Sequence, residues 1–291
     1  MSSLDAVLAF DTKLELGESP VWDERAAALY AVDILHGTVL HIDPASGTVE
    51  QIARLDELVG AIVLRRDGGL LAAVGTSLVL LDTELRRTVV AGLSDVTGLR
   101  FNDGACDPQG RFWVGTMGLD ETPGRGTLYR YDERGLVPMV ESVSISNGID
   151  WTGDGTRMIY ADTPTRRLDT FAFDAADGTL SDRRTLVELD EGSAGFPDGL
   201  TVDAEDHIWV ALWDGWAVHR YRPDGTLDRV VQLPVARPTS CAFGGEDLRD
   251  LYITSARMGL TAEALESQPH AGGVFVLRPG VGGRLPNRFA G

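Results

Sequence analysis

A pattern of alternating apolar and polar positions recurs along the chain, opened by a small or turn-forming residue and closed by Asp or Arg. Its copies stand roughly 40 to 55 residues apart, close to the ~40–50 residues expected of a four-stranded propeller blade. Turn-forming pairs such as Asp177-Gly178 and Asp224-Gly225 follow several copies. Alternation over such short segments predicts β-strands. The six copies lie at residues 37–43, 76–82, 126–132, 168–174, 215–222 and 272–278.

A second repeat lies upstream of the first in each unit. Asn102 precedes Trp113 by the same interval at which Asp198 precedes Trp209. The other four copies place Glu18, Gly60, Asn147 and Thr239 at the same leading position. Six sets of short strands separated by Gly and Asp turns predict an all-β fold, a six-bladed β-propeller with four-stranded blades. We expect residues 1–291 to form this propeller as one domain, with a two-domain chain or a β-sandwich as the weaker alternatives.

Two segments fall outside the repeat. Residues Ala6 to Phe10 form an apolar segment before the first copy, and we expect them to supply the outer strand of the last blade and so close the ring. Thr261 to Glu266 is compatible with a short helical turn.

The leading positions of the second repeat are the candidate functional residues. The first strand of each propeller blade lines the central channel, so equivalent positions from different blades converge near its axis. Asn and Asp at strand edges also form local turns, which is the competing explanation for each residue taken alone. Their shared position instead aims two carboxylates and two carboxamides at one point. The six leading residues are Glu18, Gly60, Asn102, Asn147, Asp198 and Thr239.

Such a cluster predicts a divalent cation, because two carboxylates buried side by side need a cation or a proton to neutralise them. None of the five His residues shares the leading position, so any ion is held by oxygen atoms. An oxygen shell suits Ca²⁺, Mg²⁺ or Mn²⁺, with Zn²⁺ a further candidate that lacks its favoured ligands. Three or four protein ligands leave positions open for water and substrate, as in catalytic sites.

Composition excludes several classes of function. The net charge is −18, which disfavours nucleic acid as a partner. No apolar stretch of about 18 residues predicts a membrane span, and the N-terminus lacks a signal-peptide pattern. A cytoplasmic protein that is a monomer or weak homo-oligomer is therefore expected. Cys106 and Cys241 lie in apolar runs and are predicted to be buried thiols rather than a disulfide.

Seven short motifs resemble a known family. In chain order they are Gly17-Glu-Ser-Pro-Val-Trp22, Arg100-Phe-Asn-Asp-Gly104, Gly115-Thr-Met117, Ser146-Asn-Gly148, Pro197-Asp-Gly199, Thr239-Ser-Cys-Ala-Phe-Gly-Gly245 and Ala271-Gly-Gly-Val-Phe275. Together they resemble the senescence marker protein, gluconolactonase and luciferin-regenerating-enzyme family, which includes regucalcin-like sugar lactonases. The resemblance covers nearly the whole chain.

The resemblance implies a six-bladed propeller with Glu18, Asn147 and Asp198 as ligands of one divalent metal ion. It implies that Arg100 and Asn102 hold the substrate. An acidic residue after Met117 would contact sugar hydroxyls, and both Asp120 and Glu121 are available, of which we favour Glu121. A solvated acidic loop is the competing explanation for that pair.

The favoured hypothesis is a metal-dependent hydrolase that opens a sugar (aldono-) lactone to the aldonic acid, with the small-molecule lactone as its partner. A bound dication lowers the pKa of its water and polarises the carbonyl, and Asp198 could serve as the general base. One alternative is a non-catalytic Ca²⁺-binding regulatory propeller that uses the same acidic site. The other is a phosphotriesterase-like hydrolase, against which the polar groups for reading hydroxyls argue mildly.

Overall fold

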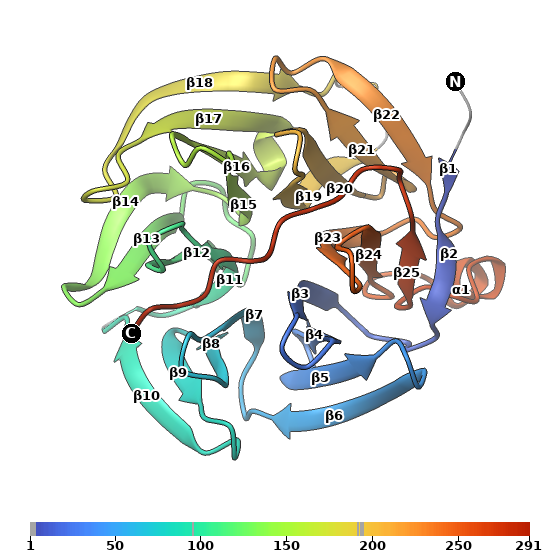
Figure 1. Ribbon diagram of the computed structural model, residues 1–291, viewed down its shortest axis with the longest axis horizontal. Coiled ribbons are helices and arrows are strands. Elements are labelled where there is room, and N and C mark those ends of the chain that lie inside the picture. Colours follow the sequence, from blue (N-terminus) through green and yellow to red (C-terminus); the bar gives the residue numbers. More distant parts are fainter. Residues whose placement is uncertain (1–3, 95, 191, 193–194) are drawn as a thin grey trace.

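The computed structural model describes residues 4–94, 96–190, 192 and 195–291. Within these residues the strands form six sheets around a central axis, each with four antiparallel strands and one with an added parallel strand at its edge (Figure 1). The predicted six-bladed propeller with four-stranded blades is therefore confirmed.

The blades follow one another in chain order, and in each blade the first strand is innermost. Blade 1 is β3 (Gly17–Asp23), β4 (Ala28–Asp33), β5 (Thr38–Asp43) and β6 (Thr48–Arg54). Blade 2 is β7 (Val59–Leu64), β8 (Leu70–Val74), β9 (Ser77–Leu81) and β10 (Arg87–Gly92). Blade 3 is β11 (Leu99–Cys106), β12 (Phe112–Gly118), β13 (Gly126–Asp132) and β14 (Gly135–Val143).

The second half repeats the arrangement with short helical insertions. Blade 4 is β15 (Ser146–Trp151), β16 (Arg157–Asp162), the 3-10 turn η1 (Thr163–Thr165), β17 (Arg167–Phe173) and β18 (Leu180–Glu188). Blade 5 is β19 (Phe196–Val202), β20 (Ile208–Trp213), β21 (Ala217–Tyr221) and β22 (Leu227–Gln232). Blade 6 is β23 (Pro238–Gly244), β24 (Asp250–Ser255), helix α1 (Ala262–Ser267) and β25 (Val274–Leu277).

The N-terminal segment closes the ring, as predicted. Strand β2 (Val7–Phe10) pairs antiparallel with β25 as the outer strand of blade 6. The sequence did not predict that β1 (Leu4–Asp5) also pairs, in parallel, with β22 at the outer edge of blade 5. The start of the chain therefore joins two adjacent blades through backbone hydrogen bonds.

The core lies between the blades and is dominated by large buried side chains, among them Trp113, Trp151 and Trp209. The Trp residues of the second repeat have a structural partner. Trp113 Nε1 donates to Asp107 and Trp209 Nε1 donates to Asp203, each at 2.9 Å. Cys106 and Cys241 are buried free thiols, as predicted.

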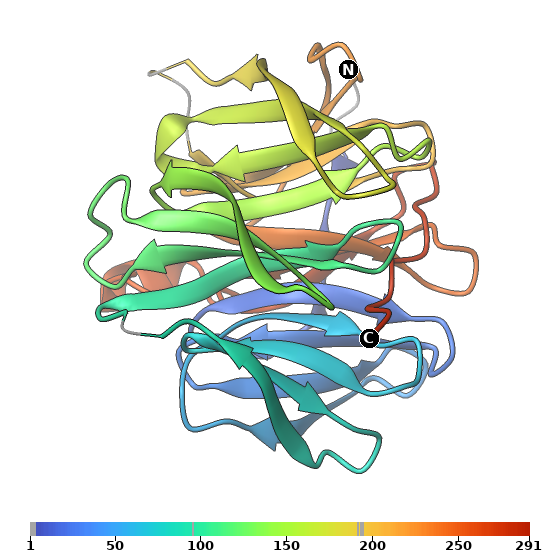
Figure 2. The ribbon, with the colours of Figure 1, turned by 90° about the vertical axis from the view of Figure 1, so that its left-hand side faces the viewer.

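The two faces of the propeller differ. Residues 278–291 run across the channel on the face seen in Figure 1, whereas α1 lies on the opposite face (Figures 1 and 2). Backbone hydrogen bonds from Gly283 to Leu248 O and from Phe289 to Leu64 O, both 2.8 Å, hold this C-terminal segment to blades 6 and 2. The C-terminal segment thus covers the channel on the face seen in Figure 1.

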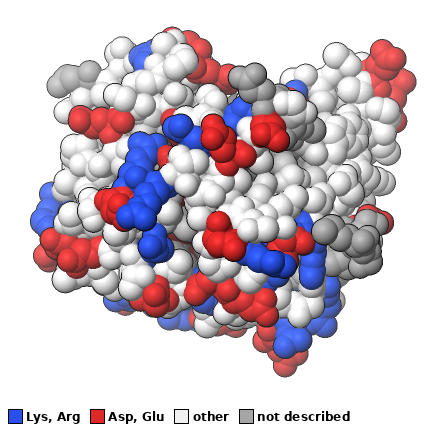
Figure 3. Space-filling model, turned by 90° about the horizontal axis from the view of Figure 1, so that it is seen from above, with Lys and Arg blue, Asp and Glu red and all other residues white. Residues whose placement is uncertain are grey.

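Acidic and basic side chains are interspersed over the side of the molecule seen in Figure 3. The basic side chains of that side form short groups with acidic side chains beside them. The described part of the chain has no helix with the length and apolar character needed to cross a membrane.

Candidate metal and substrate site

A cavity of about 290 Å³ lies around the channel end opposite the C-terminal segment. All six candidate site residues line it: Glu18, Arg100, Asn102, Glu121, Asn147 and Asp198. The remaining lining residues are Leu16, Ile34, Met117, Ile145, Thr163, Pro164, Phe196, Trp213, Asp214 and Met258. The structure therefore brings the predicted set together, and half of the cavity wall is apolar.

Each innermost strand is irregular at the leading position of the repeat. The pairing register shifts between Glu18 and Val21 in β3 and between Pro197 and Leu200 in β19, with equivalent shifts in β7, β11, β15 and β23. A β-bulge bends its strand and redirects a side chain. Ser19, within the first bulge, has a φ of 49°, a conformation that is unfavourable for a residue with a Cβ. The bulges thus set the direction of the leading side chains, of which those of Glu18, Asn102, Asn147 and Asp198 line the cavity.

Two of the six leading positions contribute nothing to the cavity wall. A Cβ at Gly60 would lie 2.4 Å from the Asn102 carbonyl oxygen, so the close approach of blades 2 and 3 requires Gly there. Thr239 is fully buried, and its Oγ1 donates to Gly17 O at 2.5 Å. Thr239 thus joins blade 6 to blade 1 and is structural.

Glu18 and Asp198 are buried carboxylates with altered acidity. Burial, followed by the charges of Asp198 and Asp103, raises the pKa of Glu18 well above its usual range. Burial and Asp103 raise the pKa of Asp198 in the same direction. A hydrogen bond from Ser19 N–H to Glu18 acts against the first shift, and hydrogen bonds from the Asn147 side chain and from Gly199 N–H to Asp198 act against the second, without cancelling them. Without a cation the fold therefore disfavours the charged form of both carboxyl groups, and a bound dication would reverse that preference.

Arg100 is the basic residue of the cavity wall. Burial lowers the pKa of its guanidinium to about 10, against the opposing effect of Glu18, Glu121 and Asp198. Its Nη1 donates to Phe101 O at 3.0 Å. Arg100 remains charged at neutral pH and presents donors to the cavity beside the carboxylates.

The Asn147 side chain supplies a direct test of whether the site fits a cation. Its Nδ2 donates to Thr163 Oγ1 at 3.0 Å, and Thr163 in turn donates to Pro197 O at 2.9 Å. These two bonds fix the amide orientation and leave Oδ1 buried without a hydrogen-bond partner. A buried acceptor without a donor is costly unless a ligand satisfies it. Together with Glu18 and Asp198 it makes an all-oxygen donor set, which suits a hard divalent cation.

No cluster of three or more His, Cys, Asp or Glu side chains with metal-binding geometry occurs among the described residues. The set of Glu18, Asn147 and Asp198 contains only two such residues, because its third member is an amide. Any ion in the cavity would thus depend on Asn147 Oδ1 as much as on either carboxylate.

The structure separates Asp120 from Glu121. Asp120 is exposed and forms an ion pair with Arg125 at 3.0 Å, whereas Glu121 lines the cavity. Asn102 also lines the cavity, and its Nδ2 donates to Ser146 O at 2.7 Å. The preference for Glu121 over Asp120 agrees with these positions, although contact with a substrate stays a prediction.

Sequence patterns did not identify three further residues that shape the site. Asp103, next to Asn102, raises the pKa of both Glu18 and Asp198. It lines a second cavity, of about 220 Å³. Thr163 orients Asn147 from η1. Trp213 lines the cavity from the end of β20. Only Asp103 had a signal in the sequence, as the acid that follows the leading Asn of its repeat.

Comparison with known proteins places this site in context. The model of the SMP-30/Gluconolactonase/LRE-like region matches residues 16–257. Regucalcin of Danio rerio is 39% identical over 297 residues, covering 100% of both chains. The crystal structure of a calcium-binding protein, regucalcin, from Agrobacterium tumefaciens is similar with a TM-score of 0.94 and 31% identity, covering 99% of both chains. A luciferin-regenerating enzyme has a TM-score of 0.91 at 27% identity, covering 98% of this chain and 99% of its own.

The matched region contains every candidate ligand and substrate residue, and the relatives align over the full chain. By sequence and by fold, this chain belongs to the SMP-30/gluconolactonase/LRE-like family.

Proposed function

We propose that this protein is a divalent-metal-dependent lactonase that opens a sugar (aldono-) lactone to the aldonic acid. The observation that carries the proposal is the unpartnered Asn147 Oδ1 in the same cavity as two buried carboxyl groups, whose charged forms the fold disfavours without a cation. Membership of a family that includes gluconolactonases supports the same reaction.

Each of the six candidate site residues has a proposed role in ester hydrolysis. Glu18, Asn147 and Asp198 would hold the divalent ion, which would supply Lewis acidity and lower the pKa of water at the site. Asp198 accepts a proton from the attacking water. The water oxygen bonds to the acyl carbon, the ring C–O bond breaks, and Asp198 returns its proton to the leaving ring oxygen, which becomes the hydroxyl of the open acid. Arg100 donates to the lactone carbonyl or to a hydroxyl, while Asn102 and Glu121 bind hydroxyls and orient the ring.

A second candidate is a calcium-binding protein without catalytic activity. It is favoured by one observation, the calcium-binding description of the similar Agrobacterium regucalcin. A purely structural ion needs no donors for a substrate, whereas Arg100, Asn102 and Glu121 line the same cavity as the ligand set. Turnover therefore discriminates the two.

The test is initial rates on a panel of aldonolactones and unsubstituted butyrolactone, using chelated protein with single divalent ions added back. We expect activity to vanish on chelation and to return with at least one ion. Polyhydroxylated lactones should exceed butyrolactone in kcat/KM, because polar groups built to bind hydroxyls are left unpaired when the hydroxyls are missing. Full activity in excess chelator would refute the metal requirement. Equal kcat/KM for the two substrate types would favour a generic esterase, and no turnover with stoichiometric Ca²⁺ binding would favour the second candidate.

A further inference from the structure

Two aromatic side chains form part of the cavity wall that the proposed chemistry does not use. Phe196 begins β19 and Trp213 ends β20, and the two residues are direct partners across the antiparallel pair. Both line the cavity that holds Asp198. They therefore stand side by side at one edge of the site, on the blade that also supplies the predicted general base.

Each ring has a guanidinium over it. The Arg237 guanidinium carbon lies 4.7 Å from the centre of the Trp213 ring, and that of Arg166 lies 4.5 Å from the centre of the Phe196 ring. Cation–π contacts of this kind stabilise a ring in one orientation. The covered faces are not available to a ligand, so the rings offer their remaining surface to the cavity.

Arg237 is itself held from three sides. Its Nε donates to Asp214 Oδ1 at 2.6 Å, its Nη1 donates to Met258 O, and its plane covers Trp213. Asp214 and Met258 also line the cavity. Arg237 occupies part of the acceptor capacity of the Asp214 carboxylate, and the neighbouring wall residues Phe196, Trp213 and Met258 are apolar. The Trp213 side of the cavity is thus rigid and largely apolar, opposite in character to the Arg100 side.

We propose that Trp213 and Phe196 form an aromatic wall that selects lactones by the ring face they present, with Arg237 as a positioning residue for Trp213. This inference rests on the proposed lactonase function and specifies its substrate class. A hydroxylated lactone fits when one face of its ring carries only C–H groups, which pack on the aromatic wall. An epimer with a hydroxyl directed at the wall would bury that group without a partner, which is unfavourable.

The test compares two aldonolactones that differ only in the configuration of one hydroxyl, using metal-loaded enzyme. For Trp213→Ala we expect KM for the preferred epimer to rise about tenfold and the ratio of kcat/KM between the epimers to fall. The apparent affinity for the activating ion should not change. Trp213→Phe should retain part of the discrimination. Trp216→Ala is the matched control, since Trp216 lies three residues further, is 41% exposed and is absent from the cavity wall.

Arg237 is tested by Arg237→Lys and Arg237→Met. The Met variant loses both the ion pair and the charge over the ring, so it should shift KM and epimer preference towards those of Trp213→Ala while kcat changes little. The Lys variant keeps a cation over the ring and should recover part of the preference. A merely structural Arg237 would lower the thermal midpoint in both variants without changing epimer preference.

An unchanged epimer ratio in Trp213→Ala, or an equal loss for every lactone, would overturn the aromatic wall. Absence of turnover in the wild-type protein would instead count against the proposed function. In that case calorimetric binding of the same two lactones to wild type and Trp213→Ala decides the matter. An epimer preference that the substitution abolishes would support the wall alone, and no preference would overturn it.

Discussion

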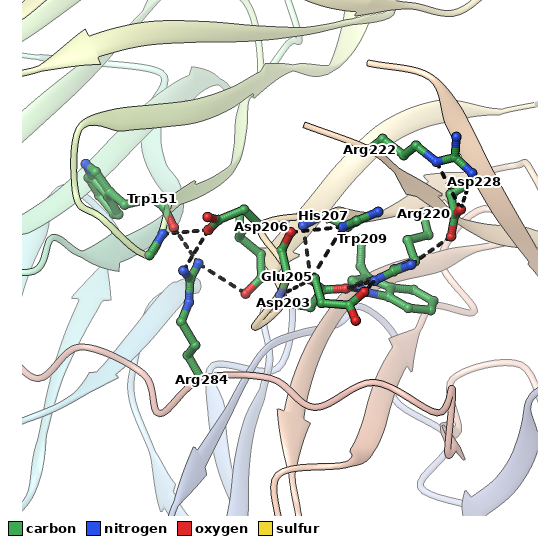
Figure 4. A network of polar contacts seen from close by, with 12 residues as sticks. Trp151, Asp203, Glu205, Asp206, His207, Trp209, Arg220, Arg222, Asp228 and Arg284 are labelled. Atoms are coloured by element: carbon green, nitrogen blue, oxygen red, sulfur yellow. Dashed lines mark hydrogen bonds and ion pairs between the residues drawn. The ribbon is translucent and has the colours of Figure 1, made fainter. Parts of the chain in front are cut away.

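Asp198, near the start of β19, and Asp203, directly after its end, show what distinguishes a functional carboxylate from a structural one. Both Asp198 and Asp203 are buried. Asp203 accepts hydrogen bonds from Trp209 Nε1, from the N–H groups of Glu205 and His207, and from Arg220 at 2.7 Å (Figure 4). Asp198 instead lies near Glu18 and Asp103, and its pKa is raised.

Both carboxylates are buried, and they differ in how completely hydrogen bonds and positive charge replace their lost hydration. At Asp203 a guanidinium and several donors replace the lost hydration, so its charge contributes to the stability of blade 5. At Asp198 the nearby Asp103 and Glu18 disfavour the charged form, and hydrogen bonds from Asn147 and Gly199 together with the charge of Arg100 offset this only in part. A carboxylate that the fold buries without completing its partners is a candidate for a ligand or a catalytic group. The motif Asp198-Gly-Leu-Thr-Val-Asp203 contains one of each kind.

The largest expected effect is on stability, at Asp203. Asp203→Asn leaves buried Arg220 with Glu205 and Asp228 as its remaining ion-pair partners, and turns an amide donor towards the donors of Arg220 and Trp209. We expect a loss of about 3 kcal/mol in the free energy of unfolding, measured by denaturant titration, with kcat per folded molecule unchanged. Asp228→Asn is the control, because Arg220 keeps Asp203 and Glu205 as partners there and a smaller loss follows. Equal losses of unfolding free energy in the two variants would contradict a larger contribution of Asp203 to stability.

The next effect is on the rate, at Asp198. Asp198→Asn keeps the shape and one oxygen but removes the charge and the basicity. If Asp198 is both ligand and general base, saturating divalent ion should leave a deficit of roughly 10²-fold or more in kcat. Glu18→Gln is the control for a ligand only, and excess ion should restore most of its rate. Direct coordination would make Asp198 a weaker base. Recovery of Asp198→Asn at saturating ion would therefore refute the base role and leave the lactonase proposal intact.

The convergence of Glu18, Asn147 and Asp198 could be predicted because the propeller repeats. Equivalent positions in a repeated blade reach equivalent places on the channel, so a shared phase in the sequence becomes a shared location. The same logic predicted that β2 completes the last blade. It could not show that Gly60 and Thr239 stay out of the cavity, since that depends on how closely neighbouring blades approach.

The remaining features depend on segments without a repeat. The orientation of the Asn147 amide is set by Thr163 in η1, an insertion particular to blade 4. The distinction between Asp120 and Glu121 depends on the conformation of one loop. Trp213 reaches the cavity because β20 ends there. The adjacent Asp214 forms an ion pair with Arg237 of the next blade. Contacts between such segments have no period that a sequence pattern could reveal.

The smallest expected effect is on the free energy of unfolding of metal-free protein. There a charged Glu18 should destabilise the fold, whereas a charged Asp203 stabilises it. In the fold, burial, Asp198 and Asp103 raise the pKa of Glu18 well above its ordinary value near 4.5. Between these two pKa values the folded chain holds a proton that the unfolded chain releases. The free energy of unfolding of chelated protein should therefore fall as pH rises through this window, and the penalty is complete above the folded-state pKa.

Glu18→Gln removes the titrating group, and with it this part of the pH dependence. At a pH above the window, the chelated variant should be more stable than chelated wild type, by on the order of 1 kcal/mol. Saturating divalent ion should reverse the order, because an ion that binds only the folded state stabilises the protein with the complete ligand set more strongly. Thermal midpoints of both proteins with and without ion test this crossover. A Glu18→Gln variant that is less stable than wild type under both conditions would mean that Glu18, like Asp203, is compensated by the fold itself.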